Sequence, residues 1–188
     1  MMKFFLLALL LYPVTVFSQQ TLCPCNFRMI TSVGMVAGES SAKPVFQLSG
    51  GITYDRFYTG IGAGLDPYRF RSVPLFADWR MDIGKKRSVV VYANAGYSFP
   101  YDNEETDESP FKISDRFTGG FYMDAGVGYR LPLNKLNRLL LSAGYSHKRI
   151  NNVVGYKYTW CLTCDEEIYT YQYDLGRIVT KLSWELGK

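Results

Sequence analysis

The sequence predicts an all-β protein, an eight-stranded antiparallel up-and-down transmembrane β-barrel with a plugged polar lumen. Three observations indicate this fold class. Eight segments alternate apolar with small or polar side chains, which is the period of a β-strand with one apolar face. Beyond residue 18, no stretch has the roughly 18 consecutive apolar residues of a transmembrane helix, and a closed barrel is the other structure that pairs every backbone group in lipid. The connections alternate between short and long, which is typical of membrane barrels.

Residues 1–18 are predicted to be a secretory signal peptide, which leaves residues 19–188 as one outer-membrane β-barrel domain. Lys3 supplies the positive start, Phe4–Tyr12 is an apolar run too short to span a bilayer, and Ser18 is a small residue before the cleavage point. The whole chain has 21 Lys and Arg against 17 Asp and Glu, so removal of Lys3 leaves 20 against 17. This mild charge and the export signal both argue against a nucleic-acid partner.

The first four alternating segments have an apolar face that we expect to be turned outward. The segments are Phe27–Gly38, Pro44–Tyr54, Arg56–Leu65 and Val73–Asp82. Their predicted outward side chains are, in order, Phe27, Met29, Val33, Met35 and Ala37; Phe46, Leu48, Ile52 and Tyr54; Ile61, Ala63 and Leu65; and Val73, Leu75, Ala77, Trp79 and Met81. The opposite face carries mostly glycine, serine and charged residues, with Tyr58 and Phe76 as large members that fit a narrow interior beside glycine.

The next three segments repeat the pattern. They are Ser88–Phe99, Phe117–Leu131 and Leu139–Lys148. Their predicted outward side chains are Val89, Val91, Ala93, Ala95, Tyr97 and Phe99; Phe121, Met123, Ala125, Val127, Tyr129 and Leu131; and Leu139, Leu141, Ala143 and Tyr145.

The eighth segment, from about Tyr171 to Leu186, changes phase. Tyr171, Tyr173 and Leu175 share one parity, whereas the apolar residues from Ile178 onward share the other. Because one extra residue moves every later side chain to the opposite face, we predict a β-bulge near Gly176–Arg177.

The predicted inward faces carry both signs of charge. The set is Arg28, Arg80, Arg130, Arg177 and Lys181 against Asp78, Asp82, Asp124 and Glu185. Eight strands leave an interior that side chains just fill, and a buried charge without its partner costs about 3–5 kcal/mol. We therefore expect these residues to pair across the lumen, to be structural, and to close it.

The long connections are expected outside the cell and the short turns in the periplasm, with both termini periplasmic. The longest connection, Asn151–Thr170, is rich in aromatic residues, which solvated loops rarely are. These are Tyr156, Tyr158, Trp160 and Tyr169. We expect this segment to extend the last two strands as a hairpin and to offer a contact surface to a partner.

The four cysteines form two close pairs. Cys161 and Cys164 are predicted to form a disulfide within the longest outer loop, because an exported chain is in an oxidising setting. Cys23 and Cys25 are separated by one residue, and for them the free, bridged and partner-linked states stay open. The barrel places the two pairs at opposite ends, which argues against a shared zinc site, and we expect no cofactor and no metal.

The single histidine, His147, is interpreted as a residue at the outer rim of the barrel. An outer-membrane lipid A deacylase of the PagL kind carries a serine two positions after a histidine near this place, but here that position is Arg149. Ser146 is adjacent to His147, so it points to the opposite face and is a poor nucleophile for it. Lys148, Arg149 and Lys157 are candidates for contacts with lipopolysaccharide phosphates.

The signal peptide, the eight alternating segments and the loop asymmetry resemble those of small eight-stranded outer-membrane barrels of the OmpA transmembrane-domain and OmpX kind. Such barrels commonly end in an aromatic residue, whereas here Trp184 is followed by four further residues. The resemblance implies a bacterial outer-membrane protein with a structural or interaction role, for example as an accessory subunit of a larger complex. Its partners would be outer-membrane lipid, lipopolysaccharide and other outer-membrane proteins. The alternatives are a lipid A-modifying hydrolase and, third, a narrow passive pore.

Overall fold

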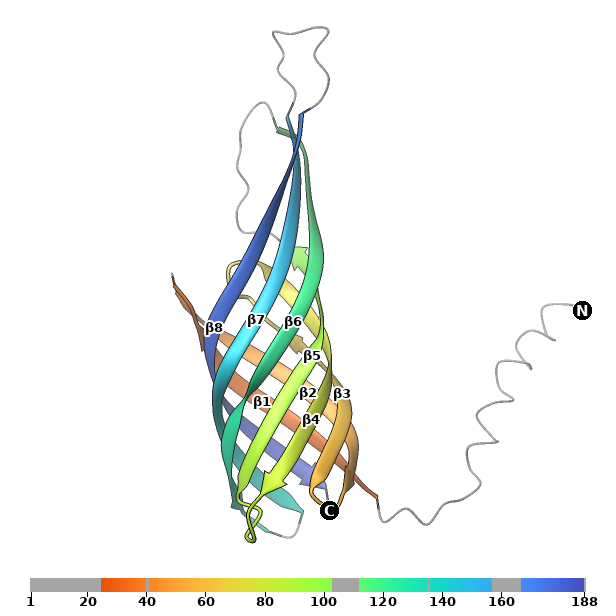
Figure 1. The fold of residues 1–188 in the computed structure, drawn as a ribbon, viewed down its shortest axis with the longest axis vertical. Coiled ribbons are helices and arrows are strands. Elements are labelled where there is room, and N and C mark those ends of the chain that lie inside the picture. Colours follow the sequence, from red (N-terminus) through yellow and green to blue (C-terminus); the bar gives the residue numbers. More distant parts are fainter. Residues whose placement is uncertain (1–24, 40, 103–111, 135, 157–166, 188) are drawn as a thin grey trace, which may run out of the picture.

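The computed structural model describes residues 25–39, 41–102, 112–134, 136–156 and 167–187. They form a closed antiparallel barrel in which each strand pairs with its sequence neighbours and the last strand closes onto the first (Figure 1). The strands are β1 (Asn26–Ala37), β2 (Ala42–Tyr54), β3 (Phe57–Leu65), β4 (Arg71–Ile83), β5 (Val89–Asp102), β6 (Lys112–Pro132), β7 (Asn137–Tyr156) and β8 (Glu167–Gly187). The predicted eight-stranded antiparallel barrel is confirmed. No helix among these residues is long and apolar enough to cross a membrane.

Side chains alternate between the outer wall and the lumen as the sequence predicts. On β3, for example, Ile61 is 78% exposed on the outer wall, whereas Tyr58 is 2% exposed inside. Large apolar side chains are exposed on the outer wall of every strand. A continuous apolar belt of this kind far exceeds the patches that soluble monomers expose, and it matches the lipid-facing band of a membrane barrel.

The predicted bulge near Gly176–Arg177 is wrong. β8 pairs with β7 in one continuous register from Glu167 to Leu186. The irregularity lies in β6, where the pairing with β7 shifts between Gly119 and Tyr122. The extra residue there reverses the parity of β6, so that Phe117, above the shift, packs its ring 5.3 Å from the inward ring of Phe70.

Two of the residues that suggested a bulge in β8, Tyr173 and Leu175, face inward. Tyr173 places its ring 4.9 Å from that of Phe70, and Leu175 packs against a buried apolar cluster that includes Val179. The lumen therefore contains apolar and aromatic side chains as well as charged ones. Because the sequence pattern assumed a polar lumen throughout, it assigned these side chains to the wrong face.

The last three strands rise far above the other five (Figure 1). The pairing of β1 with β8 ends at Ala37 and Ile178, and the pairing of β5 with β6 ends at Ser98 and Gly120. Beyond these points, β6, β7 and β8 pair only with one another among the described residues. The predicted extension of β7 and β8 is confirmed for residues 151–156 and 167–170, while residues 157–166 lie outside the described part of the chain. β6 joins the extension as a third strand.

The two ends of the barrel differ in their connections. Three short turns, 55–56, 84–88 and 133–136, lie at the end where β1 begins and β8 finishes (Figure 1). We call this the short-turn end and the other the extension end.

Candidate functional site

The lumen holds the charged residues that the sequence pointed to. All nine face inward and all are less than one tenth exposed. They are Arg28, Asp78, Arg80, Asp82, Asp124, Arg130, Arg177, Lys181 and Glu185. The structure adds two that complete the set, Asp66 and Lys148, which are also buried.

Asp124 is the centre of the middle layer of the lumen. Lys181 Nζ donates to its Oδ2 at 2.6 Å, and the Tyr92 hydroxyl donates to its Oδ1 at 3.1 Å. Gln47 Nε2 donates to the Tyr122 hydroxyl at 2.7 Å, and the Gln47 carbonyl oxygen accepts from Lys181 at 3.2 Å. Each charged group in this layer therefore has a partner of opposite charge and neutral groups that satisfy its remaining hydrogen-bonding capacity.

The extension end of the lumen is filled by a loop that folds inward between β3 and β4. We call residues Asp66–Phe70 the inward loop. Asp66 accepts from Arg177 Nη1 at 2.6 Å, and Lys148 Nζ donates at 2.9 Å to the carbonyl oxygens of both Tyr68 and Phe70. Phe70 has no exposed surface. The loop thus supplies one carboxylate and two carbonyl oxygens to two buried cations.

Close packing fixes the inward loop in place. The Tyr68 ring belongs to a buried cluster with Val36, Val45 and Val179. A Cβ atom at Gly38 would lie 2.1 Å from the Tyr68 hydroxyl, so any other residue there would force the Tyr68 ring to shift.

Lys148 does not lie on the outer rim, so its proposed contact with lipopolysaccharide phosphates is wrong. It has no exposed surface and lies 3.4 Å from Asp66. Lys148 lies two residues after Ser146 on β7, and this alternation predicts that its side chain faces the lumen. Asp66 carried no such signal, because it lies in a connection whose inward course the alternation does not reveal. Lys157 lies outside the described residues.

Glu185 is the centre of the short-turn end. Arg130 Nη2 donates to its Oε1 at 3.2 Å, while Arg28 and Arg80 approach it only to 3.7 Å. Arg130 Nε lies 2.8 Å from Oε2, an ion-pair distance without hydrogen-bond geometry. Arg130 also pairs with Asp82 at 2.6 Å. One carboxylate is therefore shared among three guanidinium groups.

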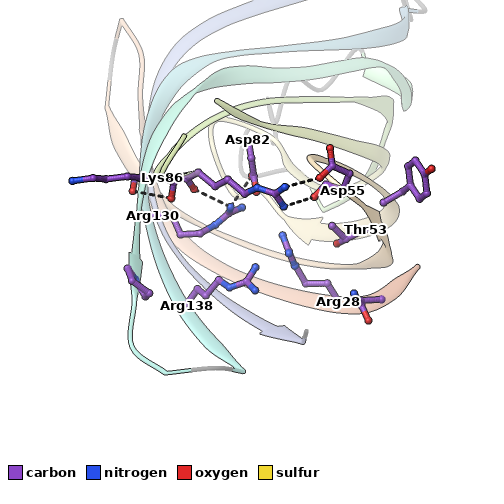
Figure 2. Close-up of a pocket in the computed structure, with 12 residues that line it drawn as sticks. Arg28, Thr53, Asp55, Asp82, Lys86, Arg130 and Arg138 are labelled. Atoms are coloured by element: carbon purple, nitrogen blue, oxygen red, sulfur yellow. Dashed lines mark hydrogen bonds and ion pairs between the residues drawn. The ribbon is translucent and has the colours of Figure 1, made fainter. Parts of the chain in front are cut away.

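A cavity of about 610 Å³ opens at this end (Figure 2). Its lining includes five cationic residues and two acidic ones. The cations are Arg28, Lys86, Arg87, Arg130 and Arg138, and the acids are Asp55 and Asp82. The cavity is bounded by lumen-facing residues at the short-turn end of the strands and by the turns 55–56 and 84–88.

His147 lies on the outer wall beside a small polar cluster. Its Nε2 is 3.5 Å from Asp174 Oδ1, which also accepts from Arg149 Nε at 2.7 Å. These contacts hold the pKa of Asp174 below its ordinary value, mainly because of the hydrogen bond from Arg149 and then that from Gln172. Ser146 faces the lumen, where Arg177 Nη2 donates to its hydroxyl at 2.9 Å. The serine and histidine are on opposite sides of the wall, as expected.

Several predicted site residues fall outside the described part of the chain. Cys23, Cys161 and Cys164 do so, and Cys25 immediately precedes β1, so the disulfides stay predictions. Tyr158 and Trp160 also lie outside. Within the described ranges, no group of three or more His, Cys, Asp and Glu side chains is placed to hold a metal ion.

Two predicted contact residues lie on the extension. Tyr156 ends β7 opposite Glu167, and Tyr169 stacks on Tyr171 with ring centroids 6.5 Å apart.

No protein-family model and no curated protein sequence matches this chain. Solved structures show a likeness of fold. The outer membrane protein OprG from Pseudomonas aeruginosa has a TM-score of 0.52 at 12% identity, over 87% of this chain and 95% of that one. The outer membrane protein AlkL, solved in lipid bilayers, has a TM-score of 0.50 at 9% identity, over 87% of this chain and 89% of that one. This chain has the fold of the small eight-stranded outer-membrane barrels. At these identities the likeness describes the fold alone, and the resemblance to OmpA and OmpX stays an expectation.

Proposed function

We propose that this protein is an integral barrel of the bacterial outer membrane, with both termini in the periplasm, that acts as an interaction component through its projecting sheet. The sheet consists of the parts of β6, β7 and β8 that rise beyond the other strands (Figure 1). The proposed partner is another envelope protein that contributes an extended segment to the edge of this sheet.

The observation that carries this proposal is the edge of β8. From Thr170 to Arg177 this strand pairs with β7 on one side and with no described strand on the other. An unpaired strand edge is a template for pairing with another chain. Tyr171 is exposed beside this edge, and Ile168 and Tyr169 are exposed further along the strand. Aromatic side chains are enriched in protein interfaces.

The filled lumen supports an interaction role over a pore. Asp78, Asp124 and Lys148 have no exposed surface, which supports a lumen that side chains fill. We therefore expect the protein reconstituted in planar bilayers to give no steady ionic current. Steady large currents would contradict the closed lumen and favour a passive pore.

The geometry gives little support to a lipid hydrolase. His147 has an acidic neighbour in Asp174, but Ser146 is on the other side of the wall. If deletion of the protein changes the lipid A composition, we expect the His147→Ala variant to restore the normal composition as the wild-type protein does. If the wild-type protein restores it and the variant does not, the hydrolase is favoured.

Site-specific photo-crosslinking in cells tests the interaction proposal. A crosslinking amino acid at Tyr171 should give a protein adduct of defined mass, whereas the same amino acid at Val127, in the apolar belt, should not. Charged residues discourage edge pairing, so the Thr170→Lys, Gln172→Lys variant should lose the adduct. Asn151→Lys, on the central strand of the sheet, should retain it. An adduct that survives the edge variant, or none at Tyr171, would overturn the proposal.

A further inference from the structure

The arginines at the short-turn end outnumber the carboxylates that can balance them. Asp82 pairs with Arg130, and Asp55 accepts from Arg87. Asp78, deeper in the lumen, is taken by Arg80 at 3.0 Å. Glu185 is the remaining acid, and Arg130 is its nearest partner. Two arginines of the cavity lining, Arg28 and Arg138, are left without a close acidic partner among the described residues.

Arg28 is buried and incompletely satisfied. It is 4% exposed, its Nε has no hydrogen-bond partner, and its contact with Glu185 is 3.7 Å long. Arg130 and Arg138 line the same cavity as Arg28. A buried cation with unmet donors costs free energy unless an acceptor of opposite charge approaches it.

The cavity offers room for such an acceptor. Figure 2 shows Arg28, Arg130 and Arg138 turned toward the same space inside the mouth. The volume of about 610 Å³ is within the range of small-molecule sites. The space lies inside the barrel mouth and opens at its end, so its occupant would come from the aqueous side of the membrane.

We propose that this cavity binds a soluble oxyanion, a phosphate or carboxylate group, between Arg28 and Arg138. The planar guanidinium group presents parallel N–H donors that match both kinds of oxyanion, and such charge-assisted hydrogen bonds are short and strong. The bound group would supply acceptors to Arg28 Nε and to Arg138. This site is independent of the projecting sheet, which lies at the opposite end of the barrel (Figure 1).

Calorimetric titration of the folded mature protein in an uncharged maltoside detergent tests the site. The probes are inorganic pyrophosphate for the phosphate class and citrate for the carboxylate class. We expect at least one probe to bind with a stoichiometry of one. Arg28→Gln and Arg138→Gln should each weaken its binding by tenfold or more, and the double variant should lose it.

Arg149→Gln is the matched control. It removes the same charge from a half-exposed arginine on the outer wall, near the extension end. Resistance to detergent-induced unfolding on a gel checks that each variant is folded. The proposal is overturned if neither probe binds the wild-type protein, if the double variant binds as tightly as wild type, or if Arg149→Gln weakens binding equally.

Discussion

The two ends of the lumen stabilise their buried cations with different acceptors. At the extension end, Asp66 serves two buried cations, Arg177 and Lys148, and the surplus donors of Lys148 are taken by backbone carbonyl oxygens of the inward loop. At the short-turn end, Glu185 is shared among three arginines, and the backbone adds one long contact, from Arg130 Nη1 to the Arg87 carbonyl oxygen at 3.4 Å. At one end the backbone of the inward loop supplies acceptors to a buried cation, and at the other end donors are left unmet.

This difference follows from the course of the connections and not from their length. The link between β3 and β4 and the turn between β4 and β5 are equally long, residues 66–70 and 84–88. The first folds into the lumen and presents the carbonyl oxygens of Tyr68 and Phe70 to Lys148. The second presents one carbonyl oxygen, that of Arg87, to Arg130 at 3.4 Å. Backbone oxygens therefore replace missing carboxylates more fully at the extension end.

The largest effect is expected from Asp66→Ala. This change leaves Arg177 and Lys148 buried without their shared carboxylate, which should cost about 3–5 kcal/mol of unfolding free energy. Urea unfolding in lipid vesicles, followed by tryptophan fluorescence, would measure it. Asp55→Asn is the comparison at the other end, where the pair with Arg87 is exposed and worth about 0–1 kcal/mol. Equal losses in the two variants would contradict the distinction between the ends.

Phe70→Ala should loosen the packing of the inward loop at the extension end. Removal of a fully buried ring costs about 3 kcal/mol or more, because a cavity remains where it packed on Phe117 and Tyr173. We expect a lower unfolding midpoint and small-ion currents in planar bilayers that the wild-type protein lacks. Phe121→Ala, on the outer wall, should leave the currents at the wild-type level. If Phe70→Ala gives no current, the polar layers close the lumen without the ring of Phe70.

Arg28→Met sharpens the comparison from the open end. Because Arg28 is incompletely paired and Glu185 keeps Arg130, replacement by an apolar chain should change the unfolding free energy by less than about 1 kcal/mol in either direction. The same urea titration measures it. A loss as large as that expected for Asp66→Ala would mean that Arg28 is a structural partner of Glu185 and has no need of a ligand.

The smallest effect is expected at Asp174, on the outer wall. Its pKa in the folded protein is lowered, so its contribution to stability is present above the pKa of the unfolded chain, 3.8, and is lost as pH falls through the lower folded value. Carboxyl NMR titration should show the pKa of Asp174 move up toward 3.8 in Arg149→Gln. An unchanged titration curve would contradict Arg149 as the main cause of the lowered pKa of Asp174.

The wall of the barrel was predictable from the sequence because side-chain direction in a strand is a local property. The alternation placed Ile61 outside and Asp78 inside, and the structure agrees. Positions where the lumen changes character were not predictable in this way. Tyr173 and Leu175 alternate in phase with the inward residues of β8. The sequence alone cannot distinguish an apolar side chain that faces the lumen from one that faces lipid when the composition of the lumen is unknown.

The sequence by itself determined the strand order, the outward apolar belt and the inward set of charges, since a period of two and the demand for paired backbone groups in lipid leave few alternatives. Tertiary structure alone decided which charges meet. Asp66 and Arg177 are 111 residues apart, and their contact depends on the course of a loop and on the closure of the barrel. The same closure, through the shared Glu185, leaves Arg28 without a close partner, because the number of acceptors within reach is a property of the whole barrel and not of any one strand.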